Sequence, residues 1–98
     1  MSDAAPVTAP SIRLGLTHRG FCGRILAIHV DQGAHGLSAS ELESRLLELG
    51  FVEGADIKVL HEGPFGRDPI AVQVNNTTIA LRRREAMAVL VAPSDVRA

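Results

Sequence analysis

The sequence predicts a mostly β fold: a small, partly open barrel of five strands with one α-helix inserted after the first strand. Short segments rich in β-branched residues alternate with glycine, proline and asparagine, as in small all-β domains. Helical spacing of apolar residues is clear in one segment, residues 38–49. The chain has 98 residues, of which 46% are hydrophobic, and this suffices for one core without a disulfide or a structural metal.

The first strand is predicted at 23–30 (GRILAIHV), an apolar segment with several β-branched residues. The helix follows at 38–49 (SASELESRLLEL), where Leu42, Leu46 and Leu49 form one apolar stripe. The glycine directly after this segment can adopt the left-handed conformation that ends a helix.

The rest of the chain is predicted to be mostly β structure. Residues 75–76 (Asn-Asn) favour a tight hairpin turn, because asparagine tolerates positive φ angles. Residues 83–86 are too few for an ordinary helix and are predicted to form a single 3₁₀ turn. The four remaining strands are predicted at 56–62, 70–74, 78–82 and 88–91.

The periodicity of these elements predicts which side chains are buried together. Every second residue of a strand faces the core, and in the helix the apolar stripe does so. The predicted core consists of Ile25, Leu42, Leu46, Leu49, Ile57, Val59, Ile70, Val72, Val74, Leu81 and Val89.

The domain is predicted to span residues 12–92, between a flexible tail at 1–11 and a short tail at 93–98. The N-terminal segment lacks the basic start and apolar stretch of a secretory signal, and no apolar run approaches the ~18 residues of a membrane span. Cys22 is the only cysteine, so the chain forms no internal disulfide, which suits a reducing compartment. We therefore expect a cytoplasmic protein that reaches the inner membrane only through a partner.

Charge is distributed unevenly along the chain, although the formal net charge is only −1. Residues 11–30 contain three arginines and no acid, and residues 31–66 contain seven acids against two basic residues. Residues 67–91 are basic again, with four basic residues against two acids. This pattern predicts a polarised surface rather than the strong basic excess of a nucleic-acid-binding protein.

The histidines and the cysteine do not form a recognisable metal site. His18 and Cys22 are four residues apart, whereas His29, His35 and His61 are scattered downstream. A structural zinc site usually shows paired ligands at close spacing, which are missing here. We predict no metal site and no cofactor, and interpret these histidines as surface or half-buried residues.

Catalytic and nucleic-acid-binding functions are not favoured either. No catalytic signature surrounds Cys22, and residues 63–69 (GPFGRDP) lack the Lys-Ser/Thr ending of a phosphate-binding loop. Proteins that bind single-stranded nucleic acid usually place aromatic side chains beside their basic residues, and none lies near Arg82, Arg83 and Arg84 in the sequence. We predict a protein that is not an enzyme and does not bind nucleic acid.

Several segments together resemble the FeoA family, the small proteins of bacterial ferrous iron uptake. They are RLLELGFVEG (45–54), DIKVL, GPFGRDPIAVQV and IALRRREAMAVLV, preceded by GFCGRILAI. The resemblance covers residues 14–92. The connector at 30–40 looks longer than the usual link of the family.

This resemblance implies an SH3-like barrel with a helix after its first strand. It implies a non-enzymatic accessory protein that binds and supports the FeoB-type ferrous iron permease, a membrane protein with a cytosolic GTPase domain. A related barrel forms the C-terminal domain of iron-dependent repressors, so a metal-binding or nucleic-acid-binding regulatory module is the alternative. A third hypothesis is direct Fe²⁺ binding through His18, Cys22, His35 or His61.

The basic residues at the end of the predicted hairpin are the candidate partner-binding site. Arg67, Arg82, Arg83 and Arg84 lie in two segments that flank the hairpin and would add their charges within one ~8–10 Å Debye length. Such a rim would steer docking on an acidic surface of the partner. The alternative is a solvated strand end in which these arginines pair with Asp68 or Glu85. A homodimer through an unpaired edge strand is also possible.

Overall fold

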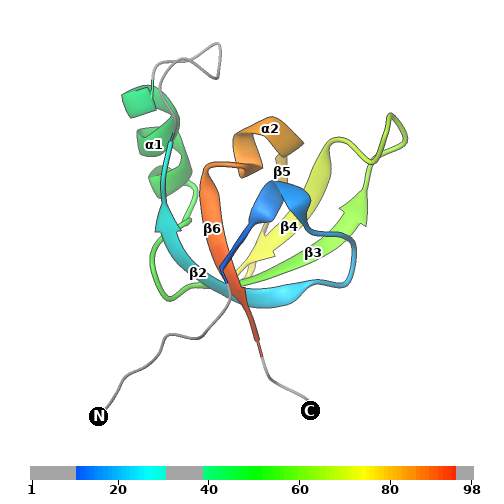
Figure 1. Ribbon diagram of the computed structural model, residues 1–98, viewed down its shortest axis with the longest axis horizontal. Coiled ribbons are helices and arrows are strands. Elements are labelled where there is room, and N and C mark those ends of the chain that lie inside the picture. Colours follow the sequence, from blue (N-terminus) through cyan, green and yellow to red (C-terminus); the bar gives the residue numbers. More distant parts are fainter. Residues whose placement is uncertain (1–10, 31–38, 95–98) are drawn as a thin grey trace.

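The computed structural model describes residues 11–30 and 39–94, and within them six strands form one antiparallel sheet. The strand order is β1-β6-β2-β3-β4-β5, and the sheet bends around the core (Figure 1). The strands are β1 (Ile12–Arg13), β2 (Cys22–Ile28), β3 (Asp56–Glu62), β4 (Ile70–Val74), β5 (Thr77–Leu81) and β6 (Val89–Pro93). Three helical segments accompany them: the 3₁₀ turn η1 (Leu14–Leu16), α1 (Ala39–Glu48) and α2 (Arg83–Ala86).

The prediction of a mostly β fold is confirmed, with one strand more than expected. The additional strand, Ile12–Arg13, pairs with β6 and is too short to show any alternation in the sequence. Hydrogen bonding does not close the sheet into a complete barrel, because β1 and β5 remain as its two edges. The predicted tails fall mostly outside the described residues and stay a prediction.

Helix α1 buries the predicted leucine stripe only in part. Leu42 and Leu46 lie in the core, whereas Leu49 is half-buried against it, which corrects its prediction as a fully buried residue. The reason is that α1 ends at Glu48, so Leu49 already belongs to the turn that leaves the helix. Gly50 has a φ of 103°, and the backbone N–H of Phe51 then bonds the carbonyl of Leu46 at 3.0 Å. This turn points Phe51 into the core.

Residues 83–86 form one turn of α-helix, so the predicted 3₁₀ turn is wrong. The N–H of Ala86 bonds the carbonyl of Arg82 and the N–H of Met87 bonds that of Arg83, both at 3.0 Å and both with the spacing of an α-helix. Ala86 is fully buried and belongs to the core cluster, so its side chain packs this turn against the core.

The other predicted core residues are all buried, and the structure adds residues that periodicity did not identify. Leu14 is fully buried although it belongs to the 3₁₀ turn η1, where neither a strand nor a helix pattern applies. The hairpin turn between β4 and β5 forms at residues 75–76, and Asn75 has a φ of 54°, as expected for a tight turn. No helix within the described ranges is long and apolar enough to cross a membrane.

The packing of α1 yields a stability prediction with a matched control. Leu46 is completely buried, whereas Leu47 next to it is 45% exposed. Leu46→Ala should lower the free energy of unfolding by roughly 2–5 kcal/mol, because it leaves a cavity in the core. Leu47→Ala should cost less than about 1 kcal/mol. Urea denaturation of both variants measures the difference, and equal midpoints would show that α1 does not pack as described.

Candidate functional site

The hairpin of β4 and β5 brings the two predicted basic segments to one end of the molecule. Ile70 pairs with Leu81, so the residues just before β4 and just after β5 are neighbours. Two bonds from Arg83 join them: its backbone N–H donates to Asp68 Oδ1, and its Nε donates to the Arg67 carbonyl, both at 2.8 Å. The two basic segments therefore lie next to one another, as expected from the sequence.

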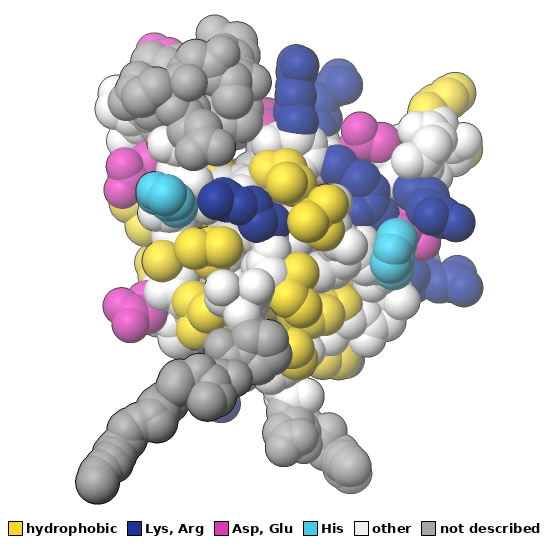
Figure 2. Space-filling model, in the orientation of Figure 1, with side chains coloured by type: hydrophobic (Ala, Val, Ile, Leu, Met, Phe, Trp, Pro, Cys, Tyr) yellow, Lys and Arg dark blue, Asp and Glu magenta, His cyan; other side chains and the backbone are white. Residues whose placement is uncertain are grey.

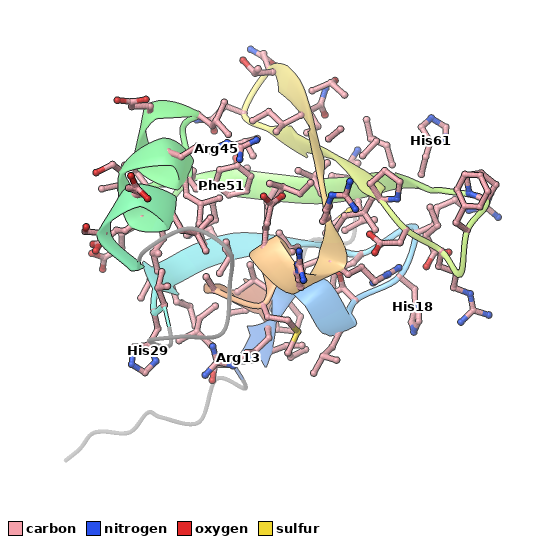
Figure 3. The ribbon with its side chains drawn as sticks, turned by 90° about the horizontal axis from the view of Figure 1, so that it is seen from above. Arg13, His18, His29, Arg45, Phe51 and His61 are labelled. Atoms are coloured by element: carbon pink, nitrogen blue, oxygen red, sulfur yellow. The ribbon has the colours of Figure 1, made fainter. Side chains whose placement is uncertain are left out.

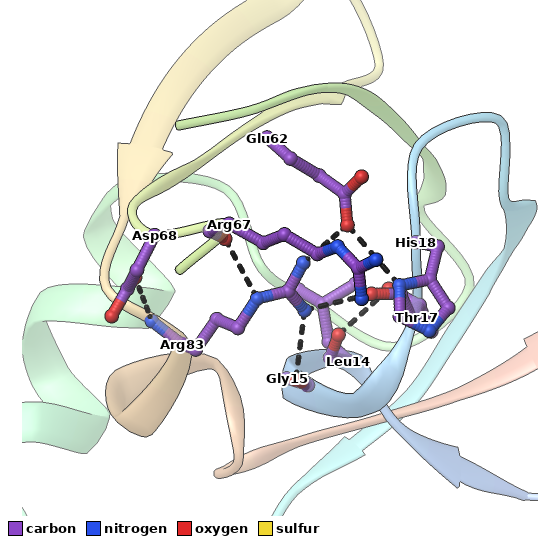
Figure 4. A network of polar contacts seen from close by, with 8 residues as sticks. All are labelled: Leu14, Gly15, Thr17, His18, Glu62, Arg67, Asp68 and Arg83. Atoms are coloured by element: carbon purple, nitrogen blue, oxygen red, sulfur yellow. Dashed lines mark hydrogen bonds and ion pairs between the residues drawn. The ribbon is translucent and has the colours of Figure 1, made fainter. Parts of the chain in front are cut away.

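The Arg83 side chain is directed inward and binds three different parts of the chain (Figure 4). Its Nη1 donates to the carbonyls of Gly15 at 2.9 Å and Thr17 at 2.7 Å. Its Nη2 forms an ion pair with Glu62 Oε2 at 2.7 Å, and both side chains are only 19% exposed. All three guanidinium nitrogens of Arg83 thus donate to acceptors within the chain. This geometry indicates that Arg83 stabilises the fold and is not a free cation at the surface.

Close backbone packing makes these bonds possible. A Cβ atom added at Gly15 would lie 2.5 Å from the carbonyl oxygen of Arg83 and 2.7 Å from the sulfur of Met87. Because a glycine stands there, η1 can lie directly against α2. The hydroxyl of the buried Thr17 donates to the Leu14 carbonyl at 2.7 Å and closes the turn. The carbonyls of Gly15 and Thr17 are then held at the guanidinium.

Glu62 accepts a second bond, from His18, on the oxygen that also binds Arg83. His18 Nδ1 lies 3.1 Å from Glu62 Oε2, and the histidine side chain is mostly exposed. The hydrogen bond from His18 lowers the pKa of Glu62, and the positive charges of His18, Arg83 and Arg67 lower it further, while desolvation opposes them. This carboxylate stays ionised and holds the end of β3 to η1 through Arg83.

Arg82 and Arg84 differ from Arg83 because their side chains are exposed. The nearby acids bind other groups: Asp68 accepts from the backbone of Arg83, and Glu85 accepts from the backbone N–H of Arg82 at 3.1 Å. Glu85 also pairs with Arg45 of α1 at 3.3 Å. Within the part of the chain that the structure describes, the guanidinium groups of Arg82 and Arg84 form no ion pair, and this end carries exposed positive charge.

An exposed aromatic side chain stands beside these arginines. Phe65 is 81% exposed, and together with Arg82 it lines a surface hollow of about 750 Å³. The other residues lining this hollow are Arg45, Asp68, Pro69, Ala80, Leu81 and Glu85. Figure 2 shows Lys and Arg side chains gathered at this end of the molecule, with few acidic side chains among them. Aromatic residues and arginine are the residue types enriched at protein–protein interfaces.

The histidines and Cys22 are not assembled into a metal centre within residues 11–30 and 39–94. No group of three or more His, Cys, Asp or Glu side chains there could hold a metal ion. His29 lies beside Arg13, far from His18 and His61 (Figure 3). Cys22 is exposed on β2, and His35 lies outside the described residues.

Comparison with protein families identifies the chain. The model of the FeoA domain matches residues 12–93. The chain belongs to the FeoA family. This is the family of ferrous iron transport accessory proteins, and the expectation from the sequence motifs is thereby confirmed. A comparison with curated protein sequences gives no match.

Solved FeoA structures share the fold. FeoA of Stenotrophomonas maltophilia, solved with zinc and described as an SH3 domain protein, is 34% identical, with a TM-score of 0.64 over 82% of this chain and 88% of that one. FeoA of Chlorobium tepidum is 28% identical, with a TM-score of 0.68 over 84% and 70% of the two chains. This FeoA-family chain therefore has an SH3-like fold, as expected.

A repressor domain shares the same fold at lower identity. IdeR of T. acidophilum is 22% identical, with a TM-score of 0.67 over 94% of this chain and 37% of that chain. At this identity the similarity concerns architecture, so it adds no argument for a regulatory function of this FeoA-family chain.

Sequence reasoning located the arginines of this site but missed the groups that bind Arg83. Gly15, Thr17 and Glu62 lie 68, 66 and 21 residues away from it in the sequence. Two of the three bind through backbone carbonyls, which any residue could supply. The sequence did contain one usable signal. Arg83 begins the turn that ends at the buried Ala86, and a residue at that position of the turn is directed toward the core.

The Arg83 contacts predict that lysine cannot replace arginine at this position. An ammonium group has three donors at one point and cannot reach the carbonyls of Gly15, Thr17 and Arg67 together with Glu62. Arg83→Lys should therefore lower the free energy of unfolding by about 2–3 kcal/mol. Arg84→Lys, in the exposed neighbour, should change it by less than about 0.5 kcal/mol. Chemical denaturation tests this, and an equal effect of both changes would contradict the structural position of Arg83.

The lowered pKa of Glu62 predicts a contribution to stability that depends on pH. A carboxyl group whose pKa is lower in the folded state stabilises the fold above its ordinary value of 4.5. This contribution is lost as the pH falls through the lowered folded value. The difference in unfolding free energy between wild type and Glu62→Gln should therefore shrink below pH 4.5. Acid titrations of denaturant midpoints measure it, with Glu43→Gln on the exposed side of α1 as control. A constant difference would exclude the Glu62 contribution.

Proposed function

We propose that this protein is a non-enzymatic accessory protein of bacterial ferrous iron uptake that binds the cytosolic part of a FeoB-type permease. Membership of the FeoA family supports the transport role. FeoA of Stenotrophomonas maltophilia is itself described as a candidate activating factor of ferrous iron transport. In this proposal the protein works in the cytoplasm and reaches the inner membrane through its partner.

The observation that carries the binding proposal is the exposed end formed by Arg82, Arg84 and Phe65. Arg67 is exposed on the adjoining loop, but its side chain is directed toward Glu62 and His18 (Figure 4), and its charge lowers the pKa of Glu62. Exposed arginines without acidic partners attract an acidic surface and raise the association rate with it. Phe65 supplies apolar area, which slows dissociation because its burial removes that area from water. Arg83 contributes by holding this end in place rather than by contact with the partner.

Uptake measurements test the transport role. Cells that lack the gene should take up ⁵⁵Fe²⁺ more slowly than wild type under anaerobic conditions, and the restored gene should reverse the defect. A purified permease cytosolic domain, with and without GTP, should bind the protein directly. Unchanged uptake together with no binding would exclude the proposed function.

The charge of Arg82 and Arg84 yields a kinetic prediction. Reversal of both charges, Arg82→Glu with Arg84→Glu, should lower the association rate with the permease domain roughly tenfold at low salt, because steering by charge is lost. The effect should fade as salt rises. Arg24→Glu with Lys58→Glu makes the same change of net charge at exposed positions on β2 and β3 that do not line the hollow beside Arg82. Because Arg24 pairs with the exposed Asp56 at 3.6 Å, circular dichroism checks that this control is folded. Surface plasmon resonance at several salt concentrations measures both pairs, and equal effects would exclude a specific docking end.

A further inference from the structure

Strand β5 has an unpaired backbone edge. The two-residue turn makes Val74 and Thr77 a hydrogen-bonded pair, and such pairs alternate with non-bonded ones along an antiparallel hairpin. Thr78 and Ala80 face Gln73 and Ala71 in the non-bonded pairs. Their N–H and C=O groups therefore point away from β4, where the sheet ends. Both residues are exposed, so two donors and two acceptors are open to another strand.

This edge lacks the usual protection against strand pairing. Exposed edge strands are commonly short, charged, interrupted by proline or distorted by a bulge. The opposite edge, β1, has only two residues. In contrast, β5 has five residues (TTIAL) without a charge or a proline, and its pairing with β4 runs without a register shift. A regular and open edge of this kind is a template for an added strand.

The hollow and the charges beside the edge of β5 indicate which side chains an added strand must carry. The 750 Å³ hollow is lined by Ala80 and Leu81 of β5 and by Arg45 of α1, so it continues the edge toward the helix. Arg82 also lines it, and the exposed Arg84 follows two residues later. Asp68 and Glu85 line the hollow as well, but Asp68 accepts from the backbone of Arg83 and Glu85 pairs with Arg45. An added segment would therefore place its side chains beside the unpaired guanidinium groups of Arg82 and Arg84 at one end of β5.

We propose that an acidic, extended segment of the partner adds to β5 as a seventh strand of the sheet. The proposal rests on the proposed function and specifies how the partner binds. Thr78 and Ala80 supply the backbone hydrogen bonds, and Arg82 and Arg84 bind the acidic side chains. In the antiparallel arrangement shared by the whole sheet, the acidic residues precede the paired residues of that segment.

Charge favours this occupant over a second copy of the chain. Two β5 strands paired with one another would bring together segments without any acidic residue. The guanidinium groups of Arg82 and Arg84 would then gain no counter-charge. An acidic segment would bond the open N–H and C=O groups of β5 and would also pair with the guanidinium groups of Arg82 and Arg84.

The backbone edge can be blocked by a single change. Ala80→Pro removes an N–H group that points away from β4, so the sheet of the protein itself loses no hydrogen bond. Ala80→Ser keeps the N–H group at the same position and is the matched control. Circular dichroism melting shows that each variant is folded, and calorimetry with the purified permease cytosolic domain gives the affinity. The affinity should fall at least about tenfold for Ala80→Pro and less than about twofold for Ala80→Ser.

Amide hydrogen exchange on the wild-type protein provides a test that needs no variant. The amides of Thr78 and Ala80 should exchange more slowly once the permease domain is bound. Unchanged exchange, or full binding by a folded Ala80→Pro variant, overturns strand addition and leaves the proposed function standing. Absence of binding by the wild type overturns both. Protection of these two amides in a concentration-dependent dimer of the protein alone would identify a second copy as the occupant and overturn the acidic segment.

Discussion

The contacts of the Arg83 guanidinium group are the interaction on which the end of the molecule around Arg82 and Arg84 depends. It joins the 3₁₀ turn η1, the end of β3 and the loop before β4 to the first residue of α2. Its acceptors are three backbone carbonyls and one carboxylate, supplied by three segments that are far from Arg83 in the sequence. A planar group with fixed donor directions suits such a set, because each bond also fixes the orientation of the others.

Three consecutive arginines have different roles because the backbone changes direction among them. Arg82 follows the last residue of β5, and its backbone N–H binds Glu85, so its side chain remains outside. Arg83 is the first residue of α2, and its side chain is directed inward, toward Gly15, Thr17 and Glu62. Arg84 lies one position further around the helical turn and is exposed again. Glu85 pairs with Arg45 and Glu62 pairs with Arg83, so neither acid neutralises the guanidinium groups of Arg82 and Arg84.

In the binding mode that we propose, an open sheet edge and a basic end act together. An SH3-like sheet that does not close through hydrogen bonds retains an edge, and β5 keeps this edge regular. The same hairpin leads directly into Arg82, so the open edge and the exposed arginines lie side by side. In the proposed complex, backbone bonds alone would accept any extended chain, whereas the arginines would select an acidic one.

The sequence by itself determined five of the six strands, the helix α1, the strand-facing and helix-facing part of the core and the family. These features depend on short-range periodicity, on glycine at turns and on motifs of contiguous residues, all of which a single chain displays. It also indicated that the two basic segments meet, because a hairpin with a two-residue turn has only one register that buries Val72 and Ile79 together. Only the tertiary structure decided that Arg83 is directed inward, that Leu14 joins the core and that residues 83–86 form an α-helical turn. Those outcomes depend on backbone carbonyls and space supplied by residues distant in the sequence, and the letters of a sequence do not show where a carbonyl group points.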